Sequence, residues 1–111
     1  MAHDYLGEFE HLVLLAVIRL DSEAYGAPIR RLIAERAERD VSFGAVYSTL
    51  RRLEAKGYIG FTVEPSTSPE GGRPRRIAHL TESGQQAVDA ARRRLERMSD
   101  SLSERIPVGP N

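Results

Sequence analysis

The sequence predicts one mainly α-helical domain with a small β-hairpin, followed by a long helix near the C-terminal end. Three patterns lead to this fold class. Apolar residues recur at helical spacing up to Gly57, alternate with polar residues from Ile59 to Val63, and return to helical spacing from Val88 to Leu102. A chain of 111 residues can bury a modest core, but it is near the size at which a second subunit adds useful stability.

The composition excludes several classes of protein. Hydrophobic residues at 41% and charged residues at 29% are typical of a water-soluble globular protein. No apolar run approaches the roughly 20 residues that cross a membrane, and no signal or transit peptide is recognisable. With no cysteine, the chain has no disulfide framework, no thiolate metal site and no cysteine nucleophile. We therefore expect a cytoplasmic protein that does not associate with a membrane.

The charge is unevenly distributed although the formal net charge is zero. Residues 1–24 hold five acidic side chains and one arginine, whereas residues 25–80 hold ten basic and six acidic side chains. Residues 81–111 are balanced. The middle of the chain is therefore the basic part, and it is the part to examine for an anionic partner.

The first predicted helix covers residues 6–21. Its apolar residues have helical spacing, but the run from Leu12 to Ile18 is apolar without interruption. Such a run is expected where a helix is covered on more than one side, by its own domain and by a partner subunit. A buried strand is the competing interpretation, although the length and the Leu, Ala and Glu content favour a helix. His11 has no metal-ligating partner at helical spacing, so we expect it to be structural.

Two further helices follow in quick succession. Tyr25-Gly26-Ala27-Pro28 opens the second, because proline is tolerated in a first helical turn, and Ile29, Leu32, Ile33 and Ala37 form its apolar face. After a brief connection, Ser42 is a candidate N-cap for the third helix and Gly57 a candidate C′ residue. Two short amphipathic helices joined by so tight a link are typical of a helix-turn-helix.

The third predicted helix has one apolar face and one outward face. Val46, Leu50 and Leu53 form the apolar stripe. The opposite side carries Gly44, Ser48, Arg51 and Ala55, so it is small in its first half and basic in its second. This surface suits a helix lying in a DNA major groove. An ordinary solvent-exposed helix is an equally good interpretation of this segment alone.

A β-hairpin with a long tip is predicted next. Ile59, Phe61 and Val63 alternate with polar residues or glycine, and an apolar segment resumes at Ile77 after a stretch rich in Pro, Ser and Gly. Arg73, Arg75 and Arg76 cluster where the tip meets the returning strand. Arginines in this place can reach DNA phosphates or a narrow minor groove. A flexible, solvated loop is the alternative.

The last predicted helix begins at Thr81, a candidate N-cap, and runs to about Arg105. Its apolar residues are spaced three and four apart in alternation, which is the narrow stripe of a coiled-coil seam. Three heptads are short for an independent coiled coil. We therefore expect the stripe to pack on two helices of a partner subunit, namely the first helix and the equivalent last helix.

The order of these elements is that of a winged helix-turn-helix, and the sequence resembles the PadR family of bacterial transcriptional regulators, in its small, single-domain branch. The resemblance rests on Tyr25-Gly26 followed by Ile29, on GAVYSTLRRLEAKGYI from Gly44, on GGRPRR from Gly71, and on LTESG from Leu80. Together these segments span nearly the whole chain. Two positions depart from the family pattern: Ala45, where threonine is common, and Ile77-Ala78-His79, where the family often carries tyrosines.

The resemblance implies a winged helix-turn-helix over residues 1–80, a dimerisation helix over residues 81–106 and a frayed tail over residues 107–111. It implies a homodimer that binds a palindromic operator in double-stranded DNA, represses transcription and is released by an effector. No cofactor and no metal are implied. The expected DNA-binding residues are Ser42, Gly44, Ala45, Tyr47, Ser48, Thr49, Arg51, Arg52, Arg73, Arg75 and Arg76. The expected dimer residues are Leu6, Phe9, Val13, Val88, Ala91, Leu95, Met98 and Leu102.

Some small members of this family bind flat aromatic drugs between their subunits, but the present chain has no tryptophan to stack against them. Tyr5 and Phe9 are weak substitutes. Two other functional classes remain as alternatives. A winged helix can serve as a protein-interaction module, which the zero net charge permits. An enzyme is the third class, but His3, His11 and His79 lie on separate elements and no catalytic constellation can be assembled from them.

Overall fold

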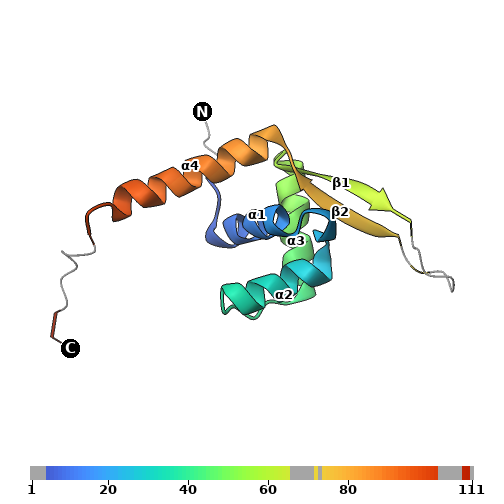
Figure 1. Ribbon diagram of the computed structural model, residues 1–111, viewed down its shortest axis with the longest axis horizontal. Coiled ribbons are helices and arrows are strands. Elements are labelled where there is room, and N and C mark those ends of the chain that lie inside the picture. The colour runs from blue at the N-terminus through green and yellow to red at the C-terminus, as the bar shows by residue number, and fades with distance from the viewer. Residues whose placement is uncertain (1–4, 66–71, 73, 103–108, 111) are drawn as a thin grey trace.

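The computed structural model describes residues 5–65, 72, 74–102 and 109–110. Four α-helices and one two-stranded antiparallel sheet make up the fold (Figure 1). In chain order the elements are α1 (Glu8–Leu20), the short 3₁₀ helix η1 (Asp21–Glu23), α2 (Gly26–Arg36), α3 (Phe43–Ala55), β1 (Ile59–Glu64), β2 (Arg75–Leu80) and α4 (Glu82–Ser99). This is the mainly helical winged-helix fold that the sequence predicts.

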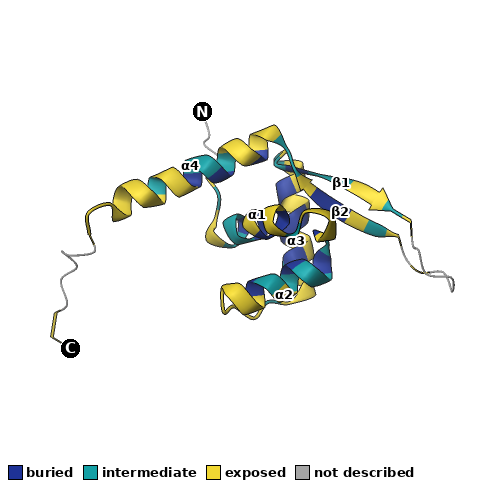
Figure 2. Ribbon diagram, in the orientation of Figure 1, coloured by how far each residue is buried: buried dark blue, intermediate teal, exposed yellow. Residues whose placement is uncertain are grey.

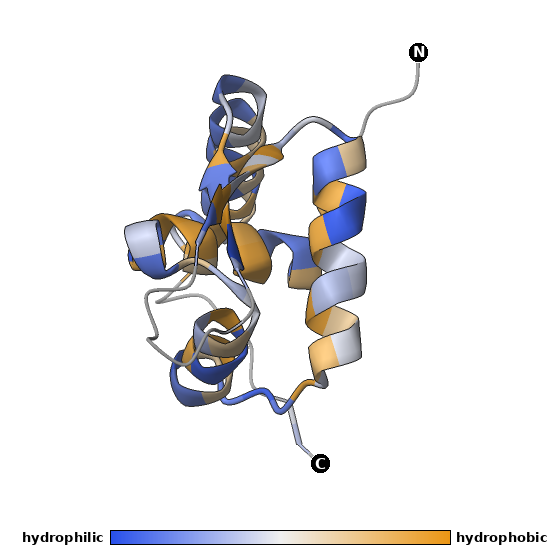
Figure 3. Ribbon diagram, turned by 90° about the vertical axis from the view of Figure 1, so that its right-hand side faces the viewer, coloured by the Kyte–Doolittle hydropathy of each residue, from blue (hydrophilic) through white to orange (hydrophobic). Residues whose placement is uncertain are grey.

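Helix α1 provides the centre of the core. Val13 and Leu14 are fully buried, and they pack in one cluster with buried residues of α2, α3 and the hairpin such as Ile29, Val46 and Ile77. Figure 3 shows apolar residues concentrated on the inner sides of the helices and hydrophilic residues on their outer sides. Leu15 and Ile18 of α1 remain exposed, so the uninterrupted apolar run is only partly covered within one protomer.

Three of the residues expected at the dimer interface belong to this core. Val13 is fully buried, and Val88 and Ala91 are buried where the first half of α4 packs on the body of the protein (Figure 2). Helical periodicity identifies an apolar face but does not tell which neighbour covers it. Because their side chains are already covered within the protomer, contact of these three residues with a partner subunit stays a prediction and adds little exposed area to an interface.

The local signals at the helix ends are confirmed. The Ser42 hydroxyl accepts a hydrogen bond from the Ala45 backbone N–H at 3.0 Å. The Thr81 hydroxyl does the same for the Gly84 N–H, also at 3.0 Å. These are the side-chain caps that free N–H groups of a first helical turn require. Gly57, just after α3, has a φ of 80°, as expected for a C′ residue.

The hairpin is fixed to the helical body at its base. Strands β1 and β2 pair from Ile59 opposite Leu80 to Glu64 opposite Arg75. On the body side, the Ala78 N–H donates to the Ala24 carbonyl oxygen at 2.8 Å, which ties β2 to the segment before α2. The hairpin therefore projects from the same body that carries α3, in the position of a wing (Figure 1).

The structure defines two element boundaries more closely than the sequence did. Strand β2 begins at Arg75, so Arg75 and Arg76, which were predicted to lie where the tip meets the returning strand, are strand residues. Helix α4 ends at Ser99 rather than near Arg105, and Leu102 lies beyond it. Serine and aspartate are poor in helix interiors because their side chains compete for backbone hydrogen bonds, and Ser99-Asp100-Ser101 places three such residues together. The rest of the expected helix and most of the hairpin tip lie outside the described residues.

Among the described residues, no helix is both long and apolar enough to span a lipid bilayer.

Candidate nucleic-acid interface

The outward face of α3 has the composition that the sequence predicts. Gly44, Ser48 and Arg51 are exposed, while Val46, Leu50 and Leu53 on the opposite side are buried. Ala45 is half-buried and Ser42 is exposed at the N-cap. Gly44, Ala45 and Ser48 therefore leave part of the first two turns with only backbone and small side chains, flanked by the exposed rings of Phe43 and Tyr47, and another molecule can approach the helix closely there.

Thr49 does not belong to this face. Its side chain is 2% exposed, and its hydroxyl lies 3.2 Å from Nη2 of Arg52, from which it accepts a hydrogen bond. Thr49 follows Val46 by three residues and precedes Leu53 by four, so it falls on the buried stripe of the helix. The expected DNA contact by Thr49 is therefore wrong, since the core already covers this residue.

Tyr47 packs against the start of α2. A Cβ atom built at Gly26 would lie only 2.6 Å from the Tyr47 hydroxyl oxygen, so only glycine leaves room for the ring in this position. Tyr47 nevertheless keeps about half of its surface exposed. Two motifs separated by a helix and a turn in the sequence thus meet in space, and the tyrosine fixes α2 against α3 while its other side faces outward.

A groove of about 360 Å³ separates α3 from the hairpin. Its walls combine aromatic rings with guanidinium groups. The residues that line it are Tyr25, Gly26, Tyr47, Leu50, Arg51, Phe61, Pro74, Arg75 and Arg76. Because α3 and the hairpin supply opposite walls, the groove brings together basic residues that are far apart in the sequence.

Arg75 is held at one end of this groove. Its Nη2 lies 3.7 Å from the Glu64 carboxylate, which belongs to the residue directly opposite on β1. The Arg75 guanidinium also lies over the Tyr25 ring, with Cζ 5.2 Å from the ring centroid, and Nη1 is 3.5 Å from the Tyr25 hydroxyl. A guanidinium attracted to the face of an aromatic ring is restricted in orientation.

Arg76, the next residue of β2, is held in a similar way. Its Cζ lies 4.3 Å from the centroid of the Phe61 ring, and its Nη2 lies 3.8 Å from the Glu54 carboxylate of α3. This ion pair joins the hairpin to the last turn of α3. Both arginines therefore combine an aromatic platform with a nearby carboxylate.

Arg52 and Lys56 form ion pairs with a third carboxylate, that of Glu10. Glu10 of α1, with a side chain only 10% exposed, lies 2.9 Å from the Lys56 ammonium and 3.6 Å from Nε of Arg52. Burial alone would raise the pKa of Glu10. The Gly7 backbone N–H, which donates to it at 2.9 Å, and the two cations outweigh burial and lower the pKa below its usual value. Arg52 is thus oriented by the body of the protein.

Arg51 is the remaining basic residue of α3, and it makes no ion pair or hydrogen bond with another residue among those described. Its side chain is exposed on the groove. Arg73 lies outside the described residues. The structure therefore brings Arg51, Arg75 and Arg76 together around one groove. Arg52, the next residue on α3, forms an ion pair with Glu10 instead.

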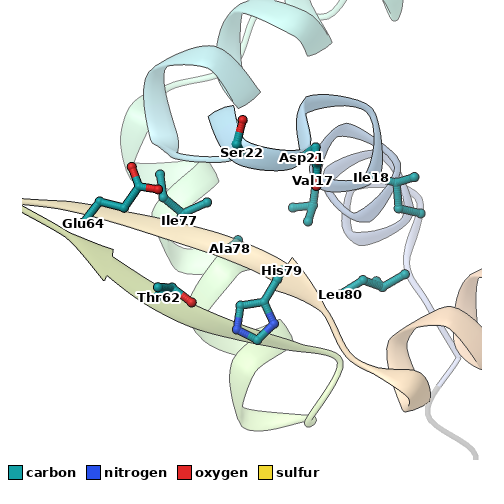
Figure 4. Close-up of a pocket in the computed structure, with 10 residues that line it drawn as sticks. All are labelled: Val17, Ile18, Asp21, Ser22, Thr62, Glu64, Ile77, Ala78, His79 and Leu80. Carbon is teal, nitrogen blue, oxygen red and sulfur yellow. The ribbon is translucent and has the colours of Figure 1, made fainter.

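A second hollow, of about 490 Å³, lies between the end of α1, η1 and the hairpin (Figure 4). Asp21, Glu64 and His79 are among its lining residues. They do not approach one another as a metal site would, and no group of three acidic or histidine side chains in the described part of the chain is arranged to hold a metal ion. Among the described residues, the hollow therefore holds no metal site that would suggest a function other than the one suggested by the basic groove.

Residues 14–90 match the family described as the transcriptional regulator PadR-like family. The match spans most of the chain. The protein belongs to the PadR-like family. This assignment confirms the predicted class, a winged-helix transcriptional regulator rather than an enzyme. A search of curated proteins gave no match.

Solved structures of similar fold include other PadR proteins. A PadR family transcription regulator from Clostridium difficile R20291 is 22% identical, with a TM-score of 0.74 over 91% of this chain and 100% of that one. A PadR-like transcription factor from Bacteroides fragilis is 24% identical, with a TM-score of 0.69 over 86% and 87%. F93 from STIV, a winged-helix DNA-binding protein, is 18% identical, with a TM-score of 0.67 over 88% and 98%.

Four residues that contact the groove arginines of this PadR-like protein were not predicted from the sequence as part of the site. Tyr25 and Phe61 supply the aromatic platforms, and Glu54 and Glu64 supply the carboxylates. Tyr25 could have been identified, since Tyr25-Gly26 is one of the segments on which the family resemblance rests. For the carboxylates no local signal exists, because their partners are set by strand register and by the packing of α3 on the hairpin.

Proposed function

We propose that this PadR-like regulator is a homodimeric repressor that binds a palindromic operator and acts in the cytoplasm. In this proposal α3 of each subunit enters the major groove, while the hairpin arginines contact the neighbouring phosphates. Binding of an effector releases the dimer from the DNA. The observation that carries the proposal is the basic groove between α3 and the hairpin, with the small, exposed face of α3 beside it.

The chemistry of this surface favours DNA over other partners. Arg51, Arg75 and Arg76 can each form charge-assisted hydrogen bonds with phosphate oxygens. Gly44, Ala45 and Ser48 allow the helix backbone to lie close to base edges, but few side chains here are long enough to read them. We therefore expect phosphate contacts to fix the register and DNA shape to contribute much of the specificity.

The dimer is proposed from the apolar surface that one protomer leaves exposed. On α4, Leu95 and Met98 are 61% and 77% exposed, although they continue the stripe that Val88 and Ala91 begin. On α1, Leu15 and Ile18 are exposed as well. A second subunit that covers both surfaces would remove this apolar area from water, which is the main favourable term in association. Leu6 and Phe9, which are half-buried, and Leu102, which is exposed beyond the helix end, stay in the proposed contact set.

The aromatic residues on which an effector could stack are already covered by arginines. Tyr5 and Phe9 are the aromatic residues on which such an effector was expected to stack, and each already has a guanidinium over its ring. Cζ of Arg94 lies 4.6 Å from the Tyr5 centroid, and Cζ of Arg39 lies 5.1 Å from the Phe9 centroid. A flat aromatic effector would have to displace these arginines or use another surface.

A titration of DNA binding against salt tests this function. The probe is a duplex carrying the region upstream of the protein's own gene, and the control is a mixed-sequence duplex of the same length. We expect log affinity to fall linearly with log salt concentration, with a slope of about 0.9 for each phosphate neutralised. An affinity that does not change with salt would contradict the groove-and-phosphate arrangement.

The alternative function is a protein-interaction module, in which the same groove binds an acidic partner protein. The substitution Arg75→Glu, alone or together with Arg73→Glu, distinguishes the two functions. Loss of DNA binding by a variant that is still folded and dimeric supports the regulator that we propose. Unchanged DNA binding together with loss of a protein partner supports the alternative.

A further inference from the structure

Most of the cations in and around the groove already have a carboxylate partner in the unbound protein, and this bears on how the proposed DNA binding is controlled. Of the five cations that α3, its C-cap and β2 present, four lie within 4 Å of a carboxylate and Arg51 alone has no such partner among the described residues. Acidic side chains thus lie beside the basic residues of the site itself, and not only in the acidic N-terminal segment. A DNA phosphate must compete with carboxylates that are already in place.

The four pairs fall into two kinds. Glu10 is nearly buried and is held by a backbone N–H as well as by two cations, so its pairs are part of the folded core. Glu54 and Glu64 differ, because their side chains are 47% and 45% exposed and each lies 3.7–3.8 Å from its arginine. Exposed pairs of this kind contribute little to stability, so another anion can replace the carboxylate at low cost.

The aromatic platforms make such a replacement simple. The Arg76 and Arg75 guanidiniums lie over the Phe61 and Tyr25 rings, with Cζ 4.3 and 5.2 Å from the ring centroids. A guanidinium has five N–H donors, so contact with a ring and with one carboxylate leaves further donors available. The arginine can therefore exchange a carboxylate for a phosphate without leaving its ring.

We propose that Glu54 and Glu64 are built-in competitors of DNA phosphates, which hold Arg76 and Arg75 in place and lower the sequence-independent part of the affinity. This inference rests on the proposed DNA-binding function and adds a control element to it. A lower non-specific affinity leaves a larger share of the discrimination to α3 and to DNA shape, since phosphate contacts carry no sequence information. Glu54 and Glu64 are thus specificity-determining residues, although neither contacts the DNA.

The test is a set of glutamine substitutions measured on the full chain. Glu54→Gln removes the carboxylate next to Arg76 and keeps the size of the side chain. The matched control is Glu96→Gln on α4, since Glu96 lies 3.8 Å from Nε of Arg92 and its loss changes the net charge by the same amount. Binding to the upstream duplex and to the mixed-sequence duplex is measured for the wild type and for both variants at equal salt.

We expect Glu54→Gln to bind the mixed-sequence duplex about two- to fivefold more tightly than the wild type, which is the range that release of one exposed ion pair allows. Glu64→Gln should behave alike, and Glu96→Gln should remain near the wild type. The gain should also disappear in an Arg76→Gln background, because Glu54 acts through Arg76. This double-mutant cycle separates competition for the arginine from simple repulsion between Glu54 and the DNA.

Two results would overturn the inference alone. One is salt-dependent binding by the wild type with no greater gain in Glu54→Gln than in Glu96→Gln. The other is a gain that persists in full when Arg76 is glutamine. Failure of the wild type to bind either duplex would instead overturn the proposed function, and the inference with it. Thermal unfolding of each variant confirms that the comparison is made between folded proteins.

Discussion

At the level of single residues, Glu10 links the first helix to the end of the third. Its carboxylate accepts hydrogen bonds from the Lys56 ammonium at 2.9 and 3.2 Å and from the Gly7 N–H at 2.9 Å. Hydrogen bonds to a charged group contribute more than neutral ones, and they are worth most where water is excluded. The base of α3 is therefore fixed to the core by a carboxylate, and the orientation of the helix depends on it.

We expect Glu10→Gln to lower the free energy of unfolding by about 1–3 kcal/mol, because Lys56 and Arg52 would lose their negative partner. Urea unfolding at neutral pH measures this loss. Glu8→Gln is the matched control on the same helix, since Glu8 pairs with Arg39 at the surface and its side chain is 82% exposed. A Glu10→Gln variant as stable as Glu8→Gln would show that the buried pair contributes nothing.

Acidification should destabilise the fold through the same region. Burial and the nearby charge of Arg94 lower the pKa of His11, whose Nε2 is buried without a hydrogen-bond partner among the described residues. Because the folded state disfavours the imidazolium, the unfolded chain binds the proton more readily as pH falls below about 6.5. Stability is therefore full above that pH and declines below it. The lowered pKa of Glu10 acts in the same direction at more acidic pH.

The substitution His11→Leu tests the histidine part of this pH dependence. We expect the variant to lose less stability than the wild type between about pH 7 and pH 5.5, since it has no imidazole to protonate. The free energy of unfolding is measured by urea denaturation at each pH. Equal losses in both proteins would contradict the assignment of this pH dependence to His11.

Residues with local partners were predictable from the sequence, whereas residues with distant partners were not. Ser42 and Thr81 were identified as N-caps because their partners lie three residues ahead. Glu10 lies 46 residues from Lys56, and no pattern in the sequence connects them. Thr49 was misassigned because a hydroxyl in the middle of a helix is compatible with either face.

At the level of elements, α4 meets the hairpin through a close backbone contact. A Cβ atom at Gly84 would lie 2.1 Å from the Tyr58 carbonyl oxygen, and the neighbouring Thr81 N–H donates to that same oxygen at 3.0 Å. The base of α4 is thus held against the start of β1. Because the obstructing atom belongs to the backbone, a larger residue at this position cannot be accommodated by a side-chain movement.

We expect Gly84→Ala to destabilise the protein by about 1–3 kcal/mol despite the higher helix propensity of alanine, because the helix must shift away from β1. Ser83→Ala, at the exposed neighbouring position, is the control and should change stability little. Thermal unfolding of both variants provides the comparison. An increase in melting temperature for Gly84→Ala would show that α4 does not lie as close to Tyr58 as described.

On α3, two substitutions separate the face that we propose for DNA from the buried stripe. Arg51→Gln should weaken DNA binding and reduce the salt slope by about 1, as expected for the loss of one phosphate contact. Thr49→Val should leave the affinity of the folded protein near that of the wild type, because Thr49 is buried. Titration of both variants on the same duplex measures the difference. A larger loss of affinity for Thr49→Val than for Arg51→Gln would reverse the assignment of the two faces.

The periodicity of the sequence predicted where elements occur better than what each of them contacts. The stripe on α4 was recognised correctly as an apolar face, but its first half covers the protomer's own core and only its second half is exposed. The start of β2 was not defined by the sequence, because Arg75 and Arg76 resemble loop residues in composition. Their place in the strand depends on pairing with β1, which a single segment does not reveal.

At the level of the whole molecule, the exposed apolar residues of α4 define the proposed dimer. We expect Leu95→Glu to yield monomers, because a charge would be placed in the seam where it could not be solvated. Gln86→Glu is the matched control, since it adds the same charge at an exposed position of the same helix outside the stripe. Sedimentation or light scattering measures the oligomeric state. A stable Leu95→Glu dimer would remove α4 from the proposed interface.

The fold of this protein could be predicted from its sequence to a greater extent than the ion pairs around its groove. The winged-helix fold follows from hydrophobic period, caps and turn residues, which are local properties of the chain. The electrostatic design of the groove follows from register and packing, which pair Arg75 with Glu64 and Arg76 with Glu54. A formal net charge of zero says nothing about such pairs.

The most direct test of the central claim is a hydroxyl-radical footprint of the protein on the duplex upstream of its gene. A homodimer that inserts one α3 per subunit should protect two half-sites whose centres are about one helical turn, roughly 34 Å, apart and related by two-fold symmetry. The hairpins should add protection of the backbone beside each half-site. A footprint with a single half-site, or none at protein concentrations that saturate a salt-dependent signal, would contradict the symmetric arrangement.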